Sequence, residues 1–378
     1  MAESTNGQIV STGAAPHVAL FLPYLASGGA ERVMLHIARG LADEGFRVDL
    51  VLAAAKGPYL KQVSPKVRVV DLKARRVITS LPGLVRYLRS ERPTALVSAL
   101  AHANLVALWA NEIARTHTRV IVTVHSTLSL STRFSPRKRD RLVPWLTHWS
   151  YKRAHRVVAV STGSAKDLVK IADLDPEIVE VIPNPVITSE LFETSRMPVD
   201  HSWFGDRSTP LLLTVGRLTA AKNYMLLLDA FREARARQPM KLVFLGDGEE
   251  REALESRVQA LGLGDDVSMP GFVDNPWAYM AKADMFVLSS KWEGLPTVLV
   301  EALALDMKVV STDCEFGPRE LLKDGKLGWL CPPGDTHSLA AAILQALREE
   351  KRTVSKEDLA AFNLEVAVRR YKALLTGT

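Results

Sequence analysis

Two series of short apolar segments, separated by amphipathic stretches, constrain the fold of this 378-residue chain more than any other feature. In the first series, segments such as VALFL and VDLVL alternate with longer stretches of helical period such as AERVMLHIARGLADEG. A second series begins near residue 210 with LLLTVG, NYMLLLDAFREARAR, KLVFLG and MFVLSS. Short β-branched segments that alternate with helical stretches indicate βαβ units and parallel sheets. We therefore predict an α/β fold with two domains, each built on a doubly wound parallel sheet.

The same periodicity indicates where the domains begin and end. The poorly periodic segment between Pro185 and Pro210 is where we expect the linker. The first residues are small and polar, with no basic segment before an apolar one, so they indicate a loose tail and not an export signal. The predicted units are a flexible tail at residues 1–15, a Rossmann-like N-terminal domain at 16–190, a linker at 191–209, a Rossmann-like C-terminal domain at 210–360 and a C-terminal helix at 361–378 that could pack back on the N-terminal domain.

Composition argues against several classes of protein. No apolar stretch approaches the ~20 residues that a membrane-spanning helix requires. Cys314 and Cys331 are the only cysteines, which argues against a disulfide framework or structural zinc and fits a reducing, cytoplasmic compartment. Asp173 and Asp175 form an Asp-x-Asp pair in a turn before a proline, whereas a catalytic metal needs oxygen ligands near the phosphates. We therefore predict no metal.

Charge is distributed unevenly along the chain. Residues 1–190 contain 25 Lys and Arg against 15 Asp and Glu, a net charge of +10, whereas the remainder has a net charge of −4. Such asymmetry suggests that the first half faces something anionic, such as phospholipid, a polyphosphate carrier or nucleic acid. The alternative is a basic surface that only solvent contacts.

Two strand-to-helix connections contain groups that suit phosphate. In SGGAERV, Gly28 and Gly29 open the first long helix, where free N–H groups and the macrodipole favour an anion. In VGRLTAAKN, Arg217 and Lys222 occupy the corresponding position of the second half, where ligands of open α/β sheets bind. A planar guanidinium and a mobile ammonium suit a diphosphate. The alternatives are a tight turn for the glycines and ordinary surface charges for the cations.

The stretch SSKWEGLPTVLVEALA places Glu293 and Glu301 eight positions apart. We expect Glu293 on a loop after a strand, and Glu301 one to two turns into the helix that begins near Pro296. Glu301 can then accept hydrogen bonds from a ribose diol while Glu293 reaches another part of the same ligand. The alternative is that Glu293 caps the helix and Glu301 is an exposed helix residue.

Two further polar residues are weaker candidates. His125 follows the strand VIVTV, at the edge where ligands of such sheets bind, although a lone histidine is often structural. Asn184 stands between two prolines in VIPNPV, which on local grounds indicates a rigid turn.

The stretch at residues 131–156 combines basic and aromatic side chains. It contains eight Lys and Arg and one acid, Asp140, while Leu142, Trp145, Leu146 and Trp149 recur at helical spacing. Tryptophans among basic side chains are typical of a helix that lies on an anionic membrane. We therefore take Arg137, Arg141, Trp145 and Trp149 as candidate membrane or acceptor residues, with core packing beside a solvated basic flank as the alternative.

An ordered set of motifs over nearly the whole chain resembles a known family. The set comprises SGGAERV, TVH, VIPNPV, VGRLTAAKN, LGDGEER, GFVDN, ADMFVLSSKWEGLPTVLVEALA, VVSTDCEFGPREL and LGWLCPPGD. It resembles the retaining, nucleotide-sugar-dependent glycosyltransferases of family 4 type, "glycosyl transferases group 1", in which two Rossmann-like domains face each other across a cleft, the GT-B architecture. The resemblance is strongest over residues 211–335. One departure is LDMKVV, where the family commonly has a Gly-containing turn.

The resemblance implies a role for each candidate residue. Glu293 would contact the sugar hydroxyls and stabilise the departing glycosyl cation, Glu301 would bind the ribose, and Arg217 and Lys222 would neutralise the leaving diphosphate. His125 would hydrogen-bond the sugar. The other donor-binding residues would be Gly28, Gly29, Asn184, Phe272, Val273, Gly294, Leu295, Pro296 and Thr297, of which Phe272 and Val273 would hold the base through main-chain contacts.

The implied reaction is metal-independent, retaining transfer of a hexose or N-acetylhexosamine from a nucleotide sugar, most often UDP-linked and next GDP-linked. The basic first half points to a lipid-linked glycan acceptor in cell-surface polysaccharide or glycoconjugate biosynthesis, with the protein peripheral on the cytoplasmic face of the membrane, no cofactor and no nucleic acid partner. The alternatives are transfer to a soluble acceptor, or a nucleotide-sugar epimerase or binding protein. A dehydrogenase is disfavoured because the Gly-x-Gly-x-x-Gly fingerprint is missing.

Overall fold

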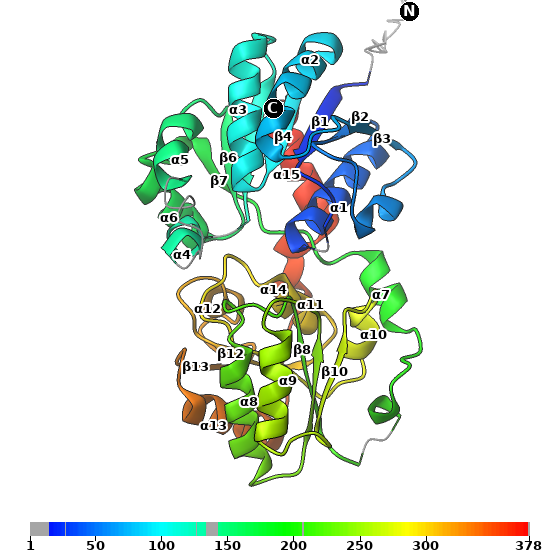
Figure 1. The fold of residues 1–378 in the computed structure, drawn as a ribbon, viewed down its shortest axis with the longest axis vertical. Helices are drawn as coiled ribbons and strands as arrows, with labels where there is room; N and C mark the ends of the chain where they lie inside the picture. The colour runs from blue at the N-terminus through cyan, green and yellow to red at the C-terminus, as the bar shows by residue number, and fades with distance from the viewer. Residues whose placement is uncertain (1–14, 27, 126, 134–142, 206–207, 377–378) are drawn as a thin grey trace, which may run out of the picture.

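The structure, a computed structural model, describes residues 15–26, 28–125, 127–133, 143–205 and 208–376. In these ranges the strands form two parallel sheets, one of seven strands in the order β3-β2-β1-β4-β5-β6-β7 and one of six in the order β10-β9-β8-β11-β12-β13. Figure 1 shows the two sheets in separate lobes along the long axis, each flanked by helices. The predicted α/β fold with two facing, Rossmann-like domains is confirmed; nearly all of the predicted tail lies outside the described residues.

The N-terminal lobe follows the βαβ pattern predicted from the sequence. Its strands are β1 (His17–Leu22), β2 (Arg47–Leu52), β3 (Val67–Asp71), β4 (Ala95–Ala99), β5 (Arg119–Val124), β6 (Arg156–Ala159) and β7 (Val179–Val181). Its helices are α1 (Gly29–Asp43), α2 (Leu81–Glu91), α3 (Ala101–Ala114), α4 (Leu128–Arg133), α5 (Val143–Tyr151) and α6 (Thr162–Ala172), with short 3₁₀ turns that include η1 (Pro58–Gln62).

The C-terminal lobe repeats the pattern with a second sheet. Its strands are β8 (Leu211–Val215), β9 (Lys241–Leu245), β10 (Val267–Gly271), β11 (Met285–Leu288), β12 (Lys308–Thr312) and β13 (Trp329–Cys331). The helices from the linker onward are α7 (Ser189–Ser195), α8 (Tyr224–Arg235), α9 (Arg251–Ala260), α10 (Pro276–Met280), α11 (Thr297–Ala304), α12 (Pro318–Leu321), α13 (Thr336–Arg348), α14 (Lys356–Leu359) and α15 (Leu364–Thr376).

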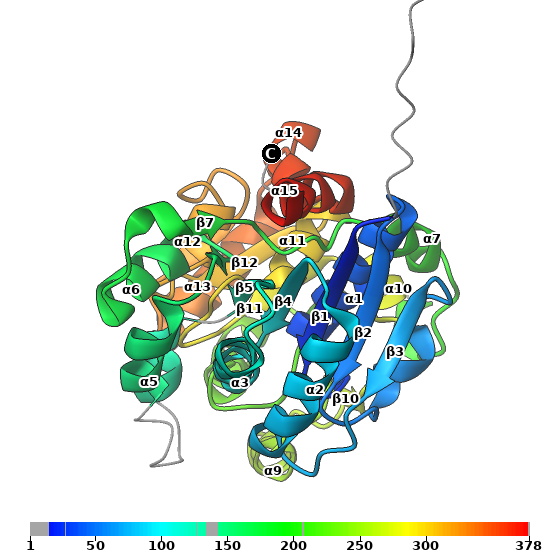
Figure 2. The ribbon, with the colours of Figure 1, turned by 90° about the horizontal axis from the view of Figure 1, so that it is seen from above.

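The strands are apolar along their length because helices cover both faces of each sheet. In β1, Leu20 and Leu22 belong to the cluster that α1 covers, whereas Ala19 and Phe21 belong to the cluster of α2 and α3. Strands buried on both faces lose the polar alternation of a half-exposed sheet. Figure 2 shows α2 and α3 on one side of the first sheet and α15 on the other.

The chain crosses between the lobes twice, and the two crossings pair with each other. The N–H groups of Val186 and Ile187 both donate to the Phe362 carbonyl, at 3.1 Å. After this point α15 packs against α1 of the first lobe, where Lys372 forms an ion pair with Glu44 at 2.8 Å. Between β7 and β8 lies α7, which packs against α10 of the second lobe. The domain boundaries given above remain a prediction.

Within the basic stretch at residues 131–156, the structure describes the end of α4, α5 (Val143–Tyr151) and the start of β6 at Arg156. Trp145, Leu146 and Trp149 lie on α5, so their predicted helical spacing is confirmed, while Leu142 lies outside the described residues. The helix ends because the chain must turn to pair β6 with β5 inside the sheet. Within the part of the chain that the structure describes, no helix combines the length and the apolar character needed to cross a bilayer.

Candidate active site

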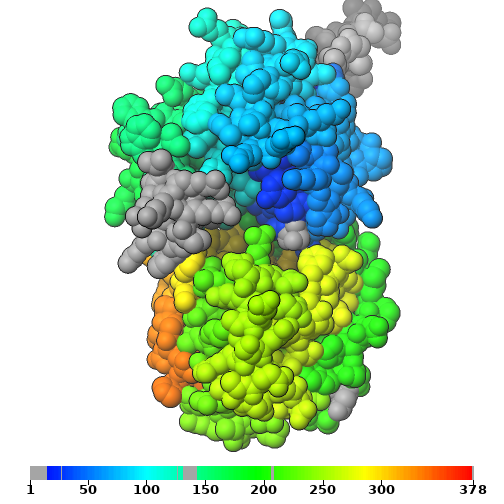
Figure 3. Space-filling view, viewed as in Figure 1, coloured from blue at the N-terminus to red at the C-terminus, as the bar shows by residue number. Residues whose placement is uncertain are grey.

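The main candidate site lies between the lobes, at the carboxyl ends of the strands. In both sheets the strand order reverses beside the first strand, between β1 and β4 and between β8 and β11. Ligands of open α/β sheets bind at such switch points. A cavity of about 520 Å³ opens there, lined by the connections after β1, β8, β10 and β11. Figure 3 shows the outer surface, on which the two lobes meet along a transverse boundary.

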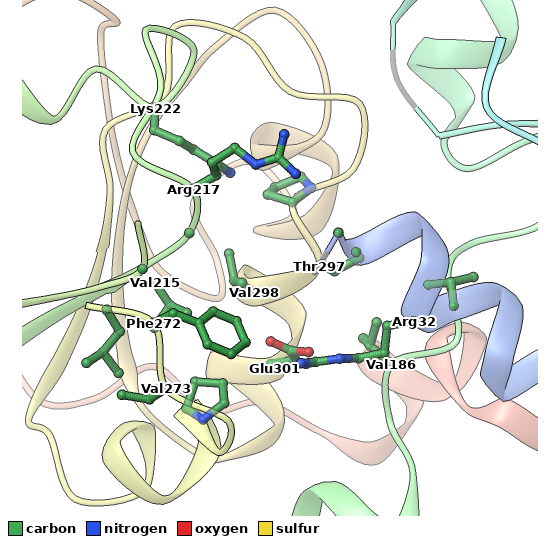
Figure 4. A pocket seen from close by; sticks show the side chains of 18 of the residues that line it. Arg32, Val186, Val215, Arg217, Lys222, Phe272, Val273, Thr297, Val298 and Glu301 are labelled. Carbon is green, nitrogen blue, oxygen red and sulfur yellow. The ribbon is translucent and has the colours of Figure 1, made fainter. Parts of the chain in front are cut away.

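One end of this cavity combines free amides with cations. Gly28 and Gly29 line it at the N-terminus of α1, and Arg217 and Lys222 line it from the connection after β8. Figure 4 shows the side chains of Arg217 and Lys222 together at this end. The connection after β8 is tied to the one after β11, because the Ser289 hydroxyl donates to the Lys222 carbonyl at 2.8 Å. The two predicted phosphate-binding connections therefore face one cavity.

Lys222 and Glu293 form an ion pair. The Lys222 ammonium lies 2.6 Å from Glu293 Oε1, and the Ser290 hydroxyl donates to the same oxygen at 2.6 Å. Burial has the largest single influence and lowers the pKa of Lys222, but the Glu293 carboxylate and other neighbours together outweigh it, so the pKa of Lys222 is raised. Lys222 therefore remains a cation in the cavity wall. Glu293 does not cap α11, so that alternative is wrong.

Glu301 is buried in the second turn of α11, with 4% of its surface exposed. It is therefore not the exposed helix residue of the alternative interpretation. Burial raises the pKa of Glu301 to about 7, although the Arg32 guanidinium acts in the opposite direction. A buried carboxylate needs partners, and the hydroxyls of a ribose would supply them.

The other predicted donor-binding residues line the same wall. Phe272 and Val273 follow β10 at the end of the cavity away from Lys222, as Figure 4 shows. Leu295, Pro296 and Thr297 line the cavity at the start of α11. Gly294 precedes them, and its carbonyl accepts a hydrogen bond at 3.0 Å from the Ser161 hydroxyl of the N-terminal lobe.

His125 and Asn184 line a second cavity, of about 410 Å³, which shares Gly29, Leu295 and Thr297 with the first. His125 Nδ1 lies 3.1 Å from the Asn184 side chain, and Nε2 lies 3.0 Å from the Thr123 hydroxyl. Burial lowers the pKa of His125 to about 4, with the Asn184 hydrogen bond acting against it, so the imidazole is neutral at pH 7. Because both ring nitrogens have protein partners, a ligand must replace one of them to bond with this ring.

The N-terminal lobe also holds the loop of Glu293 directly. The Thr127 hydroxyl donates to the Glu293 carbonyl at 2.9 Å, next to the Ser161 bond to Gly294. On the same side, the Thr162 hydroxyl donates to the Glu320 carboxylate at 3.0 Å. These bonds join the lobes beside the cavity.

Several residues near the cavity were not predicted from the sequence. Arg32 lies one turn after Gly28, and its guanidinium lies between the rings of Tyr59 and Trp277. Glu31, in the same turn, is buried with a raised pKa caused by burial, and it lines the second cavity. The SGGAERV motif contains Glu31 and Arg32, so their place at a helix N-terminus could have indicated them. Tyr59 and Trp277 have no local signal, because only the fold brings them together.

The candidate membrane residues lie apart from both cavities. Trp145 and Trp149 project from α5 with 62% and 58% of their surface exposed, so they do not pack in the core. Arg137 and Arg141 lie outside the described residues.

Among the described residues, one group of side chains lies close enough together to share a metal ion. It comprises His17, Asp49 and Glu91. It lies on the N-terminal half of the first sheet's strands, away from both cavities. Arg68 donates to both Asp49 oxygens, and Tyr87 donates to one of them at 2.6 Å. Asp49 is thus fully engaged by protein donors.

Comparisons with known proteins agree with this geometry. The family model "Glycosyl transferases group 1" matches residues 202–359, and "Glycosyltransferase Family 4" matches residues 27–190. One relative is the N-acetylgalactosamine-N,N'-diacetylbacillosaminyl-diphospho-undecaprenol 4-alpha-N-acetylgalactosaminyltransferase of Campylobacter jejuni, which is 28% identical over 88% of this chain and 90% of its own. Another is the lipopolysaccharide core biosynthesis glycosyltransferase LpsE of Rhizobium meliloti, 27% identical over 85% of this chain and 86% of its own.

Among solved structures, the chain resembles Anabaena HepE in complex with UDP-glucose, with a TM-score of 0.79 and 21% identity over 96% of this chain and 100% of that one. At this identity the likeness supports the fold, while the family models and the relatives extend over both lobes. The chain belongs to the glycosyl transferases group 1 family, with the GT-B architecture.

Proposed function

We propose that the protein is a retaining, metal-independent glycosyltransferase that transfers a hexose or N-acetylhexosamine from a UDP-sugar to a lipid-linked glycan acceptor. The observation that carries the proposal is the inter-lobe cavity, in which Arg217 and Lys222 face the N-terminus of α1 at one end and Glu301 is buried farther along. A nucleotide sugar needs cations and amides for its diphosphate and acceptors for its ribose, and this cavity offers both.

The proposed orientation of the donor follows from the order of these groups. The diphosphate lies between the α1 amides and the two cations, the ribose contacts Glu301, and the base lies near Phe272 and Val273. Departure of a nucleoside diphosphate places negative charge on the phosphate, which fixed cations and a helix N-terminus stabilise without reorganisation. These protein groups would serve where other transferases use a metal ion.

Glu293 is the proposed group at the sugar. Its carboxylate lies 2.6 Å from the Lys222 ammonium, at the end of the cavity where the diphosphate is placed. A carboxylate there stabilises positive charge that develops on the sugar as the phosphate leaves. Retention of configuration is proposed to arise from attack on the face from which the diphosphate departs, with a phosphate oxygen accepting the acceptor proton.

The lipid-linked acceptor is proposed from two observations. The Campylobacter jejuni relative acts on a diphospho-undecaprenol substrate, as its name states, and the Rhizobium relative serves lipopolysaccharide core biosynthesis. In this chain, Trp145 and Trp149 project from α5, which is followed by the exposed side chains of Lys152 and Arg153. Exposed tryptophans among cations suit the interface of an anionic membrane. We place the protein on the cytoplasmic face.

The test is to measure nucleotide release from UDP-sugars and GDP-sugars, with and without undecaprenyl-diphosphate-linked N-acetylhexosamine. The expected result is UDP release that depends on the acceptor, and a labelled lipid product. Conversion of the donor into another sugar nucleotide without acceptor would instead indicate an epimerase. Equal turnover with a soluble sugar acceptor would contradict the lipid-linked assignment.

The membrane contact is tested by sedimentation with vesicles of phosphatidylglycerol and phosphatidylcholine. The Trp145→Ala/Trp149→Ala variant is expected to lose most of its binding to the anionic vesicles, while Phe192→Ala, a change of another exposed aromatic in the linker, is expected to retain it. Equal binding by both variants would exclude α5 as the contact.

A further inference from the structure

We infer that Arg32 is a positioning residue, which holds Glu301 as the ribose acceptor and joins the two lobes over the nucleotide end of the cavity. The inference rests on the proposed function, because it assigns the partner of a carboxylate proposed to bind the donor. The SGGAERV motif contains Arg32, but no role was assigned to this residue from the sequence.

Arg32 reaches from one lobe into the other. Its guanidinium carbon lies 5.3 Å from the ring centre of Tyr59, in η1 of its own lobe, and 5.0 Å from that of Trp277, in α10 of the opposite lobe. Its Nη2 donates to the Tyr59 hydroxyl at 2.9 Å. A guanidinium between two aromatic faces has a restricted set of conformations. Figure 4 shows the Arg32 side chain pointing toward Glu301.

The charges that face Glu301 make Arg32 important to its ionisation. Glu301 is buried, and groups from three other elements surround it. They are Arg32 of α1, the Tyr59 hydroxyl of η1 and the Trp277 indole of α10. His36 of α1 lines the same cavity, and burial lowers its pKa. Of these groups Arg32 is the cation, so it opposes the rise in the pKa of Glu301 that burial causes.

Ribose binding needs this ionised state. Two vicinal hydroxyls donate two hydrogen bonds to a carboxylate, and hydrogen bonds to a charged acceptor are stronger than those to a neutral one. A protonated Glu301 has fewer acceptor sites and donates instead. Without Arg32, burial would keep Glu301 protonated at pH 7, and the nucleotide would bind more weakly because its ribose would lose an ionised acceptor.

The experiment measures UDP binding by calorimetry from pH 6 to pH 9, for wild type, Arg32→Met and Arg32→Lys. Arg32→Met is expected to weaken UDP binding about tenfold at pH 7. The loss is expected to shrink to less than about threefold at pH 9, because Glu301 ionises even without the cation. Arg32→Lys is expected to restore most of the affinity. Arg39→Met changes an exposed arginine of the same helix and is expected to match wild type.

A second comparison separates positioning from general loosening of the lobes. In the Glu301→Gln background, Arg32→Met is expected to weaken UDP binding little further, because the carboxylate on which Arg32 acts is absent. The pH dependence of UDP binding between pH 6 and pH 9 is also expected to be lost. An affinity loss that is equal at all pH values, or that persists undiminished in that background, would overturn the inference. Failure of wild type to bind UDP, GDP or any other nucleoside diphosphate would instead contradict the proposed function.

Discussion

The connection after β1 and the connection after β8 occupy the same place in their sheets but carry different groups. The first offers Gly28 and Gly29 at the start of a helix of 15 residues, with no side-chain charge at the glycines. The second offers Arg217 and Lys222 in the loop between β8 and α8. At the proposed phosphate end, the duplicated architecture has thus given one connection amides and the other connection cations. A diphosphate between them would use both kinds of group.

The two connections also differ in how tightly the backbone is packed. Gly246, after β9, lies so close to the β8 connection that a Cβ atom would lie 2.0 Å from the Gly216 carbonyl oxygen. A Cβ atom on Gly29 would instead meet only the Thr297 hydroxyl, at 3.6 Å. The C-terminal connection is therefore closely packed, whereas the N-terminal one has room for a methyl group at Gly29, although a Cβ atom on Gly28 would lie 2.3 Å from Glu31 Oε2.

The largest effect is expected for Lys222→Met. The change removes a cation from the diphosphate and leaves the Glu293 carboxylate without its partner. We expect kcat/KM for the donor to fall about a thousandfold, by analogy with loss of one charge-stabilising group. Steady-state nucleotide release checks this. Lys326→Met, a change of an exposed lysine outside the cavity, should behave as wild type.

Glu293→Gln is expected to lower kcat about a hundredfold, with a smaller change in donor KM, because the carboxylate acts on charge that develops as the sugar leaves. The amide preserves the side-chain size, and circular dichroism should show an intact fold. Glu252→Gln, on the exposed side of α9, is the matched control. Equal and mild effects at Glu293 and Glu301 would contradict the separate roles of the two acids.

Gly29→Ala tests the amide side of the comparison. Its Cβ atom has room, so the fold should persist, but the methyl group lies where a phosphate would approach the amides. We expect donor KM to rise about tenfold while kcat changes little. Gly45→Ala is a poor control because its φ of 87° strains any side chain, so Gly205→Ala, at a φ of −91°, is preferred. A fall in kcat/KM as large as that expected for Lys222→Met would show that the amides and the cations contribute alike.

The smallest effect concerns the charge of His125. With its pKa lowered to about 4 from 6.5, the folded protein binds fewer protons than the unfolded chain between these values. The free energy of unfolding should therefore rise with pH between these two pKa values, with a slope no larger than the release of one proton gives. His125→Asn should remove that part of the slope in thermal melts from pH 4 to pH 7. An unchanged slope would indicate that His125 titrates alike in the folded and unfolded chain, and would contradict the lowered pKa.

The strands that position the site could be predicted because helices cover both of their faces. β1 and β8 are continuous apolar segments, and the predicted connections follow them directly. β3 was not predicted, because it lies at the sheet edge and its residues Arg68 to Val70 are partly or fully exposed. β7, a strand of three partly buried residues, was not predicted either.

Many members of the site could be named from the sequence, but their contacts could not. Lys222 and Glu293 are 71 positions apart, and no local pattern indicates that they pair. Arg32 lies beside Trp277 because two domains close on each other, which is a property of the tertiary structure. The spacing of Trp145 and Trp149 was interpreted correctly as one face of a helix.

The most direct test of a diphosphate held between the two connections is calorimetry of wild type with uridine, UMP and UDP. We predict that UDP binds at least about tenfold more tightly than UMP and that uridine binds most weakly, because each phosphate adds charge-assisted hydrogen bonds. The gain from UMP to UDP should disappear in Lys222→Met. Uridine that binds as tightly as UDP, or a gain that survives in Lys222→Met, would contradict the account.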